Sequence, residues 1–318
     1  MTVHARLPQR RIGDREVGCI GLGCMPMSFP LMLDDRPRAL ATIHAALDAG
    51  VTLLDTANIY APAWNAMGHN EELVAEALRT WDGEAADRSA LVVATKGGIT
   101  RGPGETWGRD GSPDGLLRAA EESLRVLGVD VIDLYQHHRA DPAIPYAQQV
   151  AALGALRDRG LVRQVGLSNV NLPELDLALE LLGGTGGGGV VSVQNEFSPR
   201  YRGDADVLDR CTELGIAFLP WSPLGGADQA AEVGSRYEAF GRVAADHGVS
   251  PQRVVLAWLL ALSPVVIPIP GSSRPESVLD SVAAAELVLS ADEVAVLSTT
   301  PPAADSMYPD DQPRPPLR

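Results

Sequence analysis

The chain has 318 residues, of which 45% are hydrophobic and 5% aromatic, so aliphatic and alanine side chains must supply most of a large core. Its formal net charge of −15 at pH 7 argues against non-specific binding to nucleic acid or to an anionic membrane surface. No apolar run approaches the roughly 18 residues of a membrane-spanning helix, and no secretory signal is evident. Three cysteines without a CxxC motif favour a reducing compartment, so we expect a cytoplasmic protein without disulfides.

The 26 lysine and arginine residues include a single lysine, Lys96. Arginine therefore serves wherever the chain needs only a positive charge. Lysine differs in carrying a compact ammonium group whose pKa shifts readily when it is buried. Lys96 is therefore either a functional group beside a titrating partner, or the one lysine left by chance where base composition favours arginine. The count alone leaves both interpretations open.

Short apolar runs alternate with longer amphipathic segments, which predicts βα units around a parallel sheet. The runs are nearly continuous in Val, Ile and Leu, as expected of strands that are covered on both faces. There are eight runs, and they predict an α/β fold, a (β/α)8 TIM barrel, formed by one domain that spans residues 1–318. The predicted strands cover residues 19–23, 51–55, 91–95, 131–135, 162–167, 190–194, 216–219 and 265–268.

Additional elements are predicted at both ends of the chain. An N-terminal β-hairpin over residues 11–17 turns at Gly13-Asp14 and should plug the bottom of the barrel. Ser290 and Glu293 fit a capping box for an extra C-terminal helix outside the barrel. The proline-rich tail at 301–318 should be extended, and the glycine-rich stretch at 183–189 should be a loop at the bottom of the barrel.

The crossover helices have recognisable ends. Ser112-Pro113 supplies a cap and a first-turn proline for a helix that ends at Gly128. A helical repeat of apolar residues extends over 36–47. Other helix starts are predicted at Asn70, Pro145, Pro173, Pro251 and Pro275.

Polar or conformationally special residues follow seven of the predicted strands. In a (β/α) barrel the catalytic groups lie at the carboxyl ends of the strands, so all of these residues should face one end of the barrel. Each residue alone could be a helix cap or a loop hydrogen-bonding group, but together they predict an active site. They are Asp55, Lys96, His138, Ser168-Asn169, Gln194, Trp221-Ser222 and the segment 271–274.

Motifs along residues 11–298 resemble those of the aldo-keto reductases, in the order in which that family has them. The resemblance is carried by GLGCM at 21–25, VTLLDTANIY at 51–60, MGHNEELVAEAL at 67–78, ATK at 94–96, DLYQHH at 133–138, VGLSN at 165–169, VQN at 193–195 and WSPL at 221–224.

The resemblance implies a catalytic tetrad of Asp55, Tyr60, Lys96 and His138, in an enzyme that transfers a hydride from NADPH to a small aldehyde or ketone. Tyr60 would be the general acid, and a neighbouring ammonium should lower the pKa of its phenol from about 10. Lys96 would supply that ammonium, Asp55 would hold it, and His138 would orient the substrate carbonyl. The single lysine of the chain thus occupies the family's lysine position.

The resemblance also implies a cofactor site for NADPH, with NADH less favoured. Ser168, Asn169 and Gln194 would bind the carboxamide, and Trp221 would offer an aromatic face to the nicotinamide. Arg274 is the candidate for the 2′-phosphate of NADPH. The other cofactor candidates are Gly23, Cys24, Met25, Asp55, Ser222, Leu224, Gly225, Gly271, Ser273, Ser277 and Ser281; the last two stand where the family commonly has an arginine and an asparagine.

Two other functions are compatible with parts of the pattern. A nucleotide-binding regulatory subunit with little turnover would share the fold, but the intact tetrad favours an enzyme. A metal-dependent hydrolase could use Asp55, His137 and His138, but neighbouring residues of a strand point to opposite faces, so His137 should pack against helices. We expect no metal site; the physiological carbonyl and the oligomeric state do not follow from the sequence.

Overall fold

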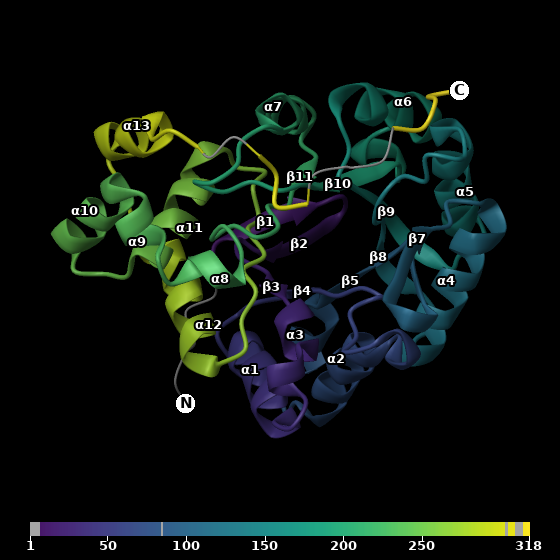
Figure 1. The fold of residues 1–318 in the computed structure, drawn as a ribbon, viewed down its shortest axis with the longest axis horizontal. Helices are drawn as coiled ribbons and strands as arrows, with labels where there is room; N and C mark the ends of the chain where they lie inside the picture. The colour runs from purple at the N-terminus through teal and green to yellow at the C-terminus, as the bar shows by residue number, and fades with distance from the viewer. Residues whose placement is uncertain (1–6, 84, 303–304, 309–313) are drawn as a thin grey trace.

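The computed structural model describes residues 7–83, 85–302, 305–308 and 314–318. Within these residues, seven parallel strands form one curled sheet, and helices cover its outer face (Figure 1). The neighbours in the sheet follow the order of the chain, as the predicted (β/α)8 barrel requires. The strands are β3 (Leu22–Gly23), β4 (Leu53–Asp55), β5 (Val92–Gly97), β8 (Ile132–His137), β9 (Val162–Ser168), β10 (Val190–Gln194) and β11 (Ala217–Phe218).

The eighth position of the barrel differs from the prediction of a regular strand at 265–268. The segment there forms isolated parallel bridges from Val266 to Phe218 and from Gly271 to Gly23. Pro268 and Pro270 interrupt the ladder because proline has no N–H to donate. Their carbonyl oxygens still accept hydrogen bonds from the N–H groups of Gly21 and Gly23, at 2.9 and 3.0 Å. The barrel therefore closes through a proline-containing segment.

The predicted N-terminal hairpin is confirmed. Strands β1 (Gln9–Ile12) and β2 (Arg15–Gly18) pair antiparallel around Gly13, whose positive φ of 58° favours glycine. Ile12 and Val17 are fully buried in a cluster that includes residues from the amino-terminal ends of the barrel strands. The hairpin thus fills the end of the barrel opposite to the carboxyl ends of the strands.

Sequence signals at the helix ends are also confirmed. The hydroxyl of Ser112 accepts a hydrogen bond from the N–H of Gly115, and Ser290 forms a reciprocal capping box with Glu293 at the C-terminal helix. The barrel helices and the C-terminal helix are α1 (Arg36–Asp48), α2 (His69–Thr80), α4 (Pro113–Leu127), α5 (Tyr146–Asp158), α6 (Leu172–Leu182), α7 (Ala205–Leu214), α11 (Pro251–Leu262), α12 (Pro275–Val282) and α13 (Ala291–Thr299).

Several short elements were not predicted from the sequence. After β5, a hairpin of β6 (Ile99–Gly102) and β7 (Thr106–Arg109) extends from the same end of the barrel as the tetrad. Three helices, α8 (Ala227–Ala230), α9 (Val233–Arg236) and α10 (Glu238–His247), lie between β11 and α11. The remaining pieces are α3 (Ala85–Ala90) and six short 3-10 turns, at Met25–Ser28, Pro30–Met32, Trp64–Ala66, Pro103–Glu105, Thr185–Gly187 and Ala283–Glu286.

The described tail residues, 305–308 and 314–318, form neither helix nor strand, as predicted. They lie across the end of the barrel where the strands have their carboxyl ends. The carbonyl oxygens of Pro316 and Leu317 accept hydrogen bonds from the N–H groups of Tyr146 and Ala147 at the start of α5, at 2.8 and 3.0 Å. The described helices include none with the length and apolar character needed to cross a bilayer.

Candidate active site

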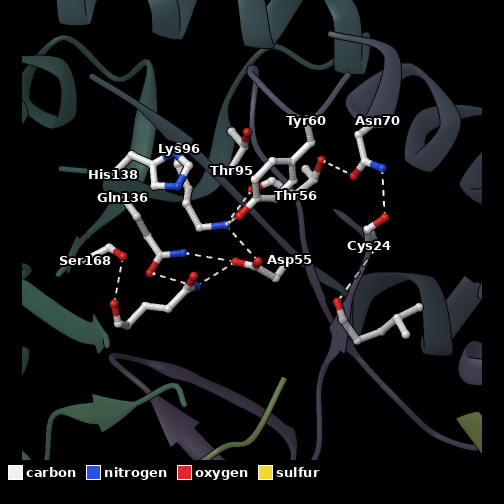
Figure 2. Close-up of polar contacts among 12 residues, drawn as sticks. Cys24, Asp55, Thr56, Tyr60, Asn70, Thr95, Lys96, Gln136, His138 and Ser168 are labelled. Atoms are coloured by element: carbon white, nitrogen blue, oxygen red, sulfur yellow. Dashed lines mark hydrogen bonds and ion pairs between the residues drawn. The ribbon is translucent and has the colours of Figure 1, made fainter. Parts of the chain in front are cut away.

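The four tetrad residues come together at the carboxyl ends of β4, β5 and β8. Asp55 ends β4, Lys96 lies near the end of β5, and His138 directly follows β8. Tyr60 lies in the loop after β4 and turns back toward Lys96 (Figure 2). The register of the parallel strands brings these distant parts of the sequence to one end of the barrel.

The ammonium group of Lys96 is completely buried and has three acceptors. Its Nζ donates to Oδ2 of Asp55 at 2.7 Å, to the carbonyl oxygen of Thr56 at 2.9 Å and to the phenol oxygen of Tyr60 at 3.1 Å. Burial lowers the pKa of Lys96, but Asp55 and Tyr60 more than offset it, so the net pKa lies above the ordinary value. The lysine is therefore charged at neutral pH.

Tyr60 departs from the expected fall in its pKa. Burial raises the pKa of the phenol, and the attraction of Lys96, which lowers it, does not fully compensate. The net pKa of Tyr60 lies above its ordinary value in the chain alone. The prediction of a net decrease was wrong because it counted the ammonium and not the loss of water. The phenol keeps its proton at neutral pH, which is the state that a general acid needs.

His138 completes the group as a neutral imidazole. Its ring meets the ring of Tyr60 edge-on, with the centroids 5.8 Å apart and an angle of 85° between the planes. Burial, followed by the charge of Lys96, holds the pKa of His138 well below its ordinary value. A neutral imidazole can donate one hydrogen bond to a carbonyl oxygen.

Asp55 is held on its other oxygen by two amides from inside the barrel. Its Oδ1 accepts from Nε2 of Gln194 at 2.7 Å and from Nε2 of Gln136 at 3.3 Å. Gln136 was not predicted from the sequence, although it lies near the end of β8, two residues before His138, and so points to the same side. These bonds fix the carboxylate that faces Lys96.

His137 lies on the opposite side of β8 from His138, as predicted. It is fully buried, and its ring centroid lies 6.2 Å from that of Tyr146 on α5. Burial lowers the pKa of His137 to about 4. Among the described residues, no group of three or more His, Cys, Asp or Glu side chains could hold a metal ion.

Four of the predicted cofactor residues form one hydrogen-bonded group beside the tetrad. Ser168 Oγ donates to the carbonyl oxygen of Gln194 at 2.7 Å, and Asn169 Nδ2 donates to Ser168 Oγ at 2.9 Å. Trp221 Nε1 donates to Asn169 Oδ1 at 3.1 Å, which fixes the orientation of a half-buried indole ring. Asn169 and Ser222 have positive φ angles of 58° and 47°, a strain that is commonly found at binding sites.

The phosphate candidates form a separate group along α12, with Arg274 just before its first residue and Ser281 in its last turn. Arg274 is exposed, and its Nη2 donates to Ser277 Oγ at 3.3 Å. Ser281 Oγ donates to the carbonyl oxygen of Ser277 at 2.9 Å. The guanidinium and the hydroxyl groups fit an anionic phosphate, and the free N–H groups of a helix start add to that fit.

The remaining candidates differ in their accessibility. Gly23 and Gly271 pair at the closure of the barrel, while Met25, Leu224 and Ser273 are half-buried and Gly225 is buried. The side chain of Cys24 is fully buried, its thiol faces the carbonyl of Leu22, and its own carbonyl accepts from Asn70. The thiol of Cys24 therefore belongs to the wall behind the site, and contact of this residue with a cofactor stays a prediction.

The C-terminal tail contacts Trp221, one of the predicted cofactor residues, and the sequence did not predict this contact. The ring centroids of Tyr308 and Trp221 are 5.8 Å apart. Ser306 and Met307 donate to the buried carboxylate of Glu196 at 2.6 and 2.9 Å. A cavity of about 100 Å³ lies between them, lined by Asn169, Glu196, Trp221, Tyr308 and neighbouring residues.

Comparison with known proteins gives one consistent result. A family model described as the aldo/keto reductase family matches residues 20–299. The chain is 35% identical to an uncharacterized oxidoreductase of Schizosaccharomyces pombe, over 90% of this chain and 88% of that protein. It is 31% identical to pyridoxine 4-dehydrogenase of Escherichia coli, over 91% and 95%. A crystal structure of an aldo/keto reductase from Klebsiella pneumoniae with NADP and acetate superposes with a TM-score of 0.76 at 26% identity, covering 97% of this chain and 99% of that one.

Proposed function

Because the chain belongs to the aldo/keto reductase family, we propose that it is an oxidoreductase that reduces the carbonyl group of a small aldehyde or ketone with NADPH. The observation that carries this proposal is the 3.1 Å contact between Lys96 Nζ and the phenol oxygen of Tyr60 in a buried site. A regulatory subunit with little turnover would have no need of a proton donor held in this way.

The residues at the strand ends fit a nicotinamide dinucleotide. Trp221 offers a half-buried aromatic face, and Ser168, Asn169 and Gln194 offer polar groups beside it. Arg274 and Ser277 would bind the 2′-phosphate and thereby favour NADPH over NADH. When bound, the nicotinamide supplies the hydride that reduces the carbonyl carbon.

The chain itself supplies the proton and the orientation. Tyr60 donates its phenolic proton to the carbonyl oxygen as that oxygen gains negative charge, and it regains a proton from water afterwards. Lys96 stabilises the phenolate that remains, and Asp55 keeps the ammonium in place. His138 donates a hydrogen bond to the same carbonyl oxygen and so directs it toward Tyr60.

A second cavity, lined in part by Asn58 from the loop that carries Tyr60, is the candidate for the substrate pocket. Its volume is about 280 Å³, and its lining includes Asn58, Met67, Ile99 and Arg101. Phe197 does not contribute to this lining: it packs in the core with its ring 5.8 Å from that of Phe218. Pyridoxal belongs in the panel of test substrates, because one relative is named pyridoxine 4-dehydrogenase.

The experiment measures NADPH consumption by the purified chain with a panel of carbonyls that includes a nitrobenzaldehyde and pyridoxal. Tyr60→Phe should abolish turnover and leave NADPH binding, measured by quenching of tryptophan fluorescence, nearly unchanged. Tyr237→Phe is the matched control, because Tyr237 lies at the start of α10, away from the tetrad, and it should retain full activity. A chain that binds NADPH but reduces no carbonyl would support the regulatory subunit instead.

A further inference from the structure

Asn70 is a fully buried residue in the first turn of α2, within the motif at 67–78, and the family resemblance assigns it no role in the reaction. The role inferred for Asn70 rests on the proposed function, because it concerns the proton that Tyr60 donates. The three acceptors of the Lys96 ammonium belong to Asp55, Thr56 and Tyr60, which lie on one short stretch of the chain from the last residue of β4 into the loop that follows it. The geometry of the proton donor therefore depends on what holds that stretch.

Asn70 bonds to both ends of the segment from Thr56 to Tyr60. Its side-chain Oδ1 accepts a hydrogen bond from Thr56 Oγ1 at 2.7 Å, and its backbone N–H donates to the carbonyl oxygen of Tyr60 at 3.1 Å. The backbone of Thr56 is also tied to β5 by a 2.8 Å bond from its N–H to the carbonyl oxygen of Ala94. Figure 2 shows the amide of Asn70 beside Thr56.

The side-chain amide of Asn70 is also held by hydrogen bonds on its nitrogen. Asn70 Nδ2 donates to the carbonyl oxygen of Cys24 at 2.8 Å and to Ser28 Oγ at 2.7 Å. Both donor hydrogens and one acceptor position of the amide are thus used, and the side chain cannot turn without leaving buried polar groups unpaired. The position of Thr56 is therefore fixed by a rigid support.

Glu71, the residue after Asn70, supports the strand that carries Lys96. Oε1 of Glu71, which is also fully buried, accepts from Thr95 Oγ1 at 2.5 Å, and Thr95 precedes Lys96 on β5. One turn of α2 thus contacts the loop that carries the phenol and the strand that carries the ammonium. The separation of the two groups follows from this shared support.

We infer that Asn70 is a positioning residue for the reaction: through Thr56 and the backbone of Tyr60, it sets the distance between the phenol of Tyr60 and the ammonium of Lys96 and so the rate of proton transfer. The role is distinct from that of the tetrad, because Asn70 touches neither Lys96 nor the phenol. An error of about 1 Å in such a placement can reduce a rate by about 100-fold.

The test removes the link without changing the size of the side chain. Thr56→Val deletes the hydroxyl that bonds Asn70, Thr56→Ser keeps it, and Asn70→Asp keeps the acceptor while losing both donors. Thr42→Val is the matched control, because Thr42 is equally buried and its hydroxyl bonds only within α1, to the carbonyl oxygen of Arg38. All four variants are assayed as full chains with NADPH and the best carbonyl found.

Thr56→Val and Asn70→Asp should lower kcat about 10-fold or more, with KM and the dissociation constant of NADPH nearly unchanged, and should enlarge the solvent deuterium isotope effect. Thr56→Ser and Thr42→Val should behave like the wild type. An unchanged solvent isotope effect in Thr56→Val would overturn the inference. A smaller amount of folded enzyme lowers the measured rate but leaves the isotope effect as it is, whereas slower proton transfer enlarges it.

A crystal structure of Thr56→Val separates this inference from the proposed function. The distance from Lys96 Nζ to the phenol oxygen of Tyr60 should exceed about 3.5 Å, the limit of a hydrogen bond. A distance that stays at the native 3.1 Å would refute the positioning role even if the wild type proved inactive. An inactive wild type with a lengthened distance in the variant would refute only the proposed reaction.

Discussion

Oδ2 of Asp55 lies 2.7 Å from Nζ of Lys96 in an ion pair with almost no exposure to water. The cost of removing two charges from water is large, and it is offset only when their remaining hydrogen-bonding positions are filled. Here Gln194 and Gln136 fill those of the carboxylate, while Thr56 and Tyr60 fill those of the ammonium. These hydrogen bonds stabilise the ion pair between Asp55 and Lys96 inside the barrel.

Breaking this pair on one side should destabilise the fold. Lys96→Met leaves the Asp55 carboxylate buried without its partner, which should lower the free energy of unfolding by about 3–5 kcal/mol. The double variant Asp55→Asn/Lys96→Met removes both charges and should recover much of that loss while remaining inactive. Urea unfolding of the two single variants and of the double variant measures the coupling free energy between Asp55 and Lys96. If the losses of stability in the two single variants add up to the loss in the double variant, the two residues are not coupled and the prediction is wrong.

His137 should make the stability of the fold depend on pH. Its pKa is about 4 in the folded chain and about 6.5 when exposed. Below pH 6.5 the unfolded chain takes up a proton that the folded chain does not accept until about pH 4, so stability is lost as the pH falls through this interval. The difference of about 2.5 pKa units corresponds to a loss on the order of 3 kcal/mol.

The variant His137→Leu tests this contribution. Asp141 and Arg109 are the charged groups that act on His137, and the variant leaves both in place. Unfolding by urea at a series of pH values from 7 to 4 should show a smaller decrease in stability for the variant than for the wild type. Equal decreases would show that the imidazole is protonated in the folded chain at a higher pH.

The ring of Tyr308 should contribute to cofactor binding. It packs against Trp221, the proposed nicotinamide platform, and aromatic pairs contribute about 0.5–1.5 kcal/mol. Tyr308→Ala should therefore weaken NADPH binding by about 2- to 10-fold, and Tyr308→Phe, which keeps the ring, should not. Fluorescence titration measures both variants. Tighter binding by Tyr308→Ala would mean instead that the ring occupies space that the cofactor needs.

Arg274 should decide between the two nicotinamide cofactors. Replacing it with alanine removes a charge-assisted contact to the 2′-phosphate and should weaken NADPH binding by about 10-fold or more, with NADH binding unchanged. Arg242→Ala is the control, because Arg242 is exposed on α10 and carries the same charge. Equally weakened binding of NADPH and NADH would place Arg274 at the pyrophosphate. Unchanged binding of both would show that Arg274 does not contact the cofactor.

Much of this protein was determined by the sequence alone. The near-continuous apolar runs predict the strands because both faces of a parallel sheet are covered, and helix caps such as Ser112 act through bonds to residues three positions away. Asp55, Lys96 and His138 could be placed at one end of the barrel because each lies where a predicted strand ends, whereas Tyr60 was added by the resemblance to the aldo-keto reductases. Lys96 was conspicuous even before that, as the single lysine.

The tertiary structure decided what depends on distant partners. Burial raises the pKa of Tyr60 by more than the charge of Lys96 lowers it, and burial is not visible in the local pattern. Tyr308 packs against Trp221, which lies 87 positions earlier in the chain, and no local pattern predicts that contact. Gln136 and Asn70 lie in motifs that the sequence shows, but their hydrogen bonds to Asp55 and Thr56 depend on how the strands and α2 pack. The segment at the eighth position closes the barrel through only a few bonds because Pro268 and Pro270 have no N–H to donate. Their carbonyl oxygens accept from Gly21 and Gly23 on one side, and the N–H of Ile267 donates to Phe218 on the other.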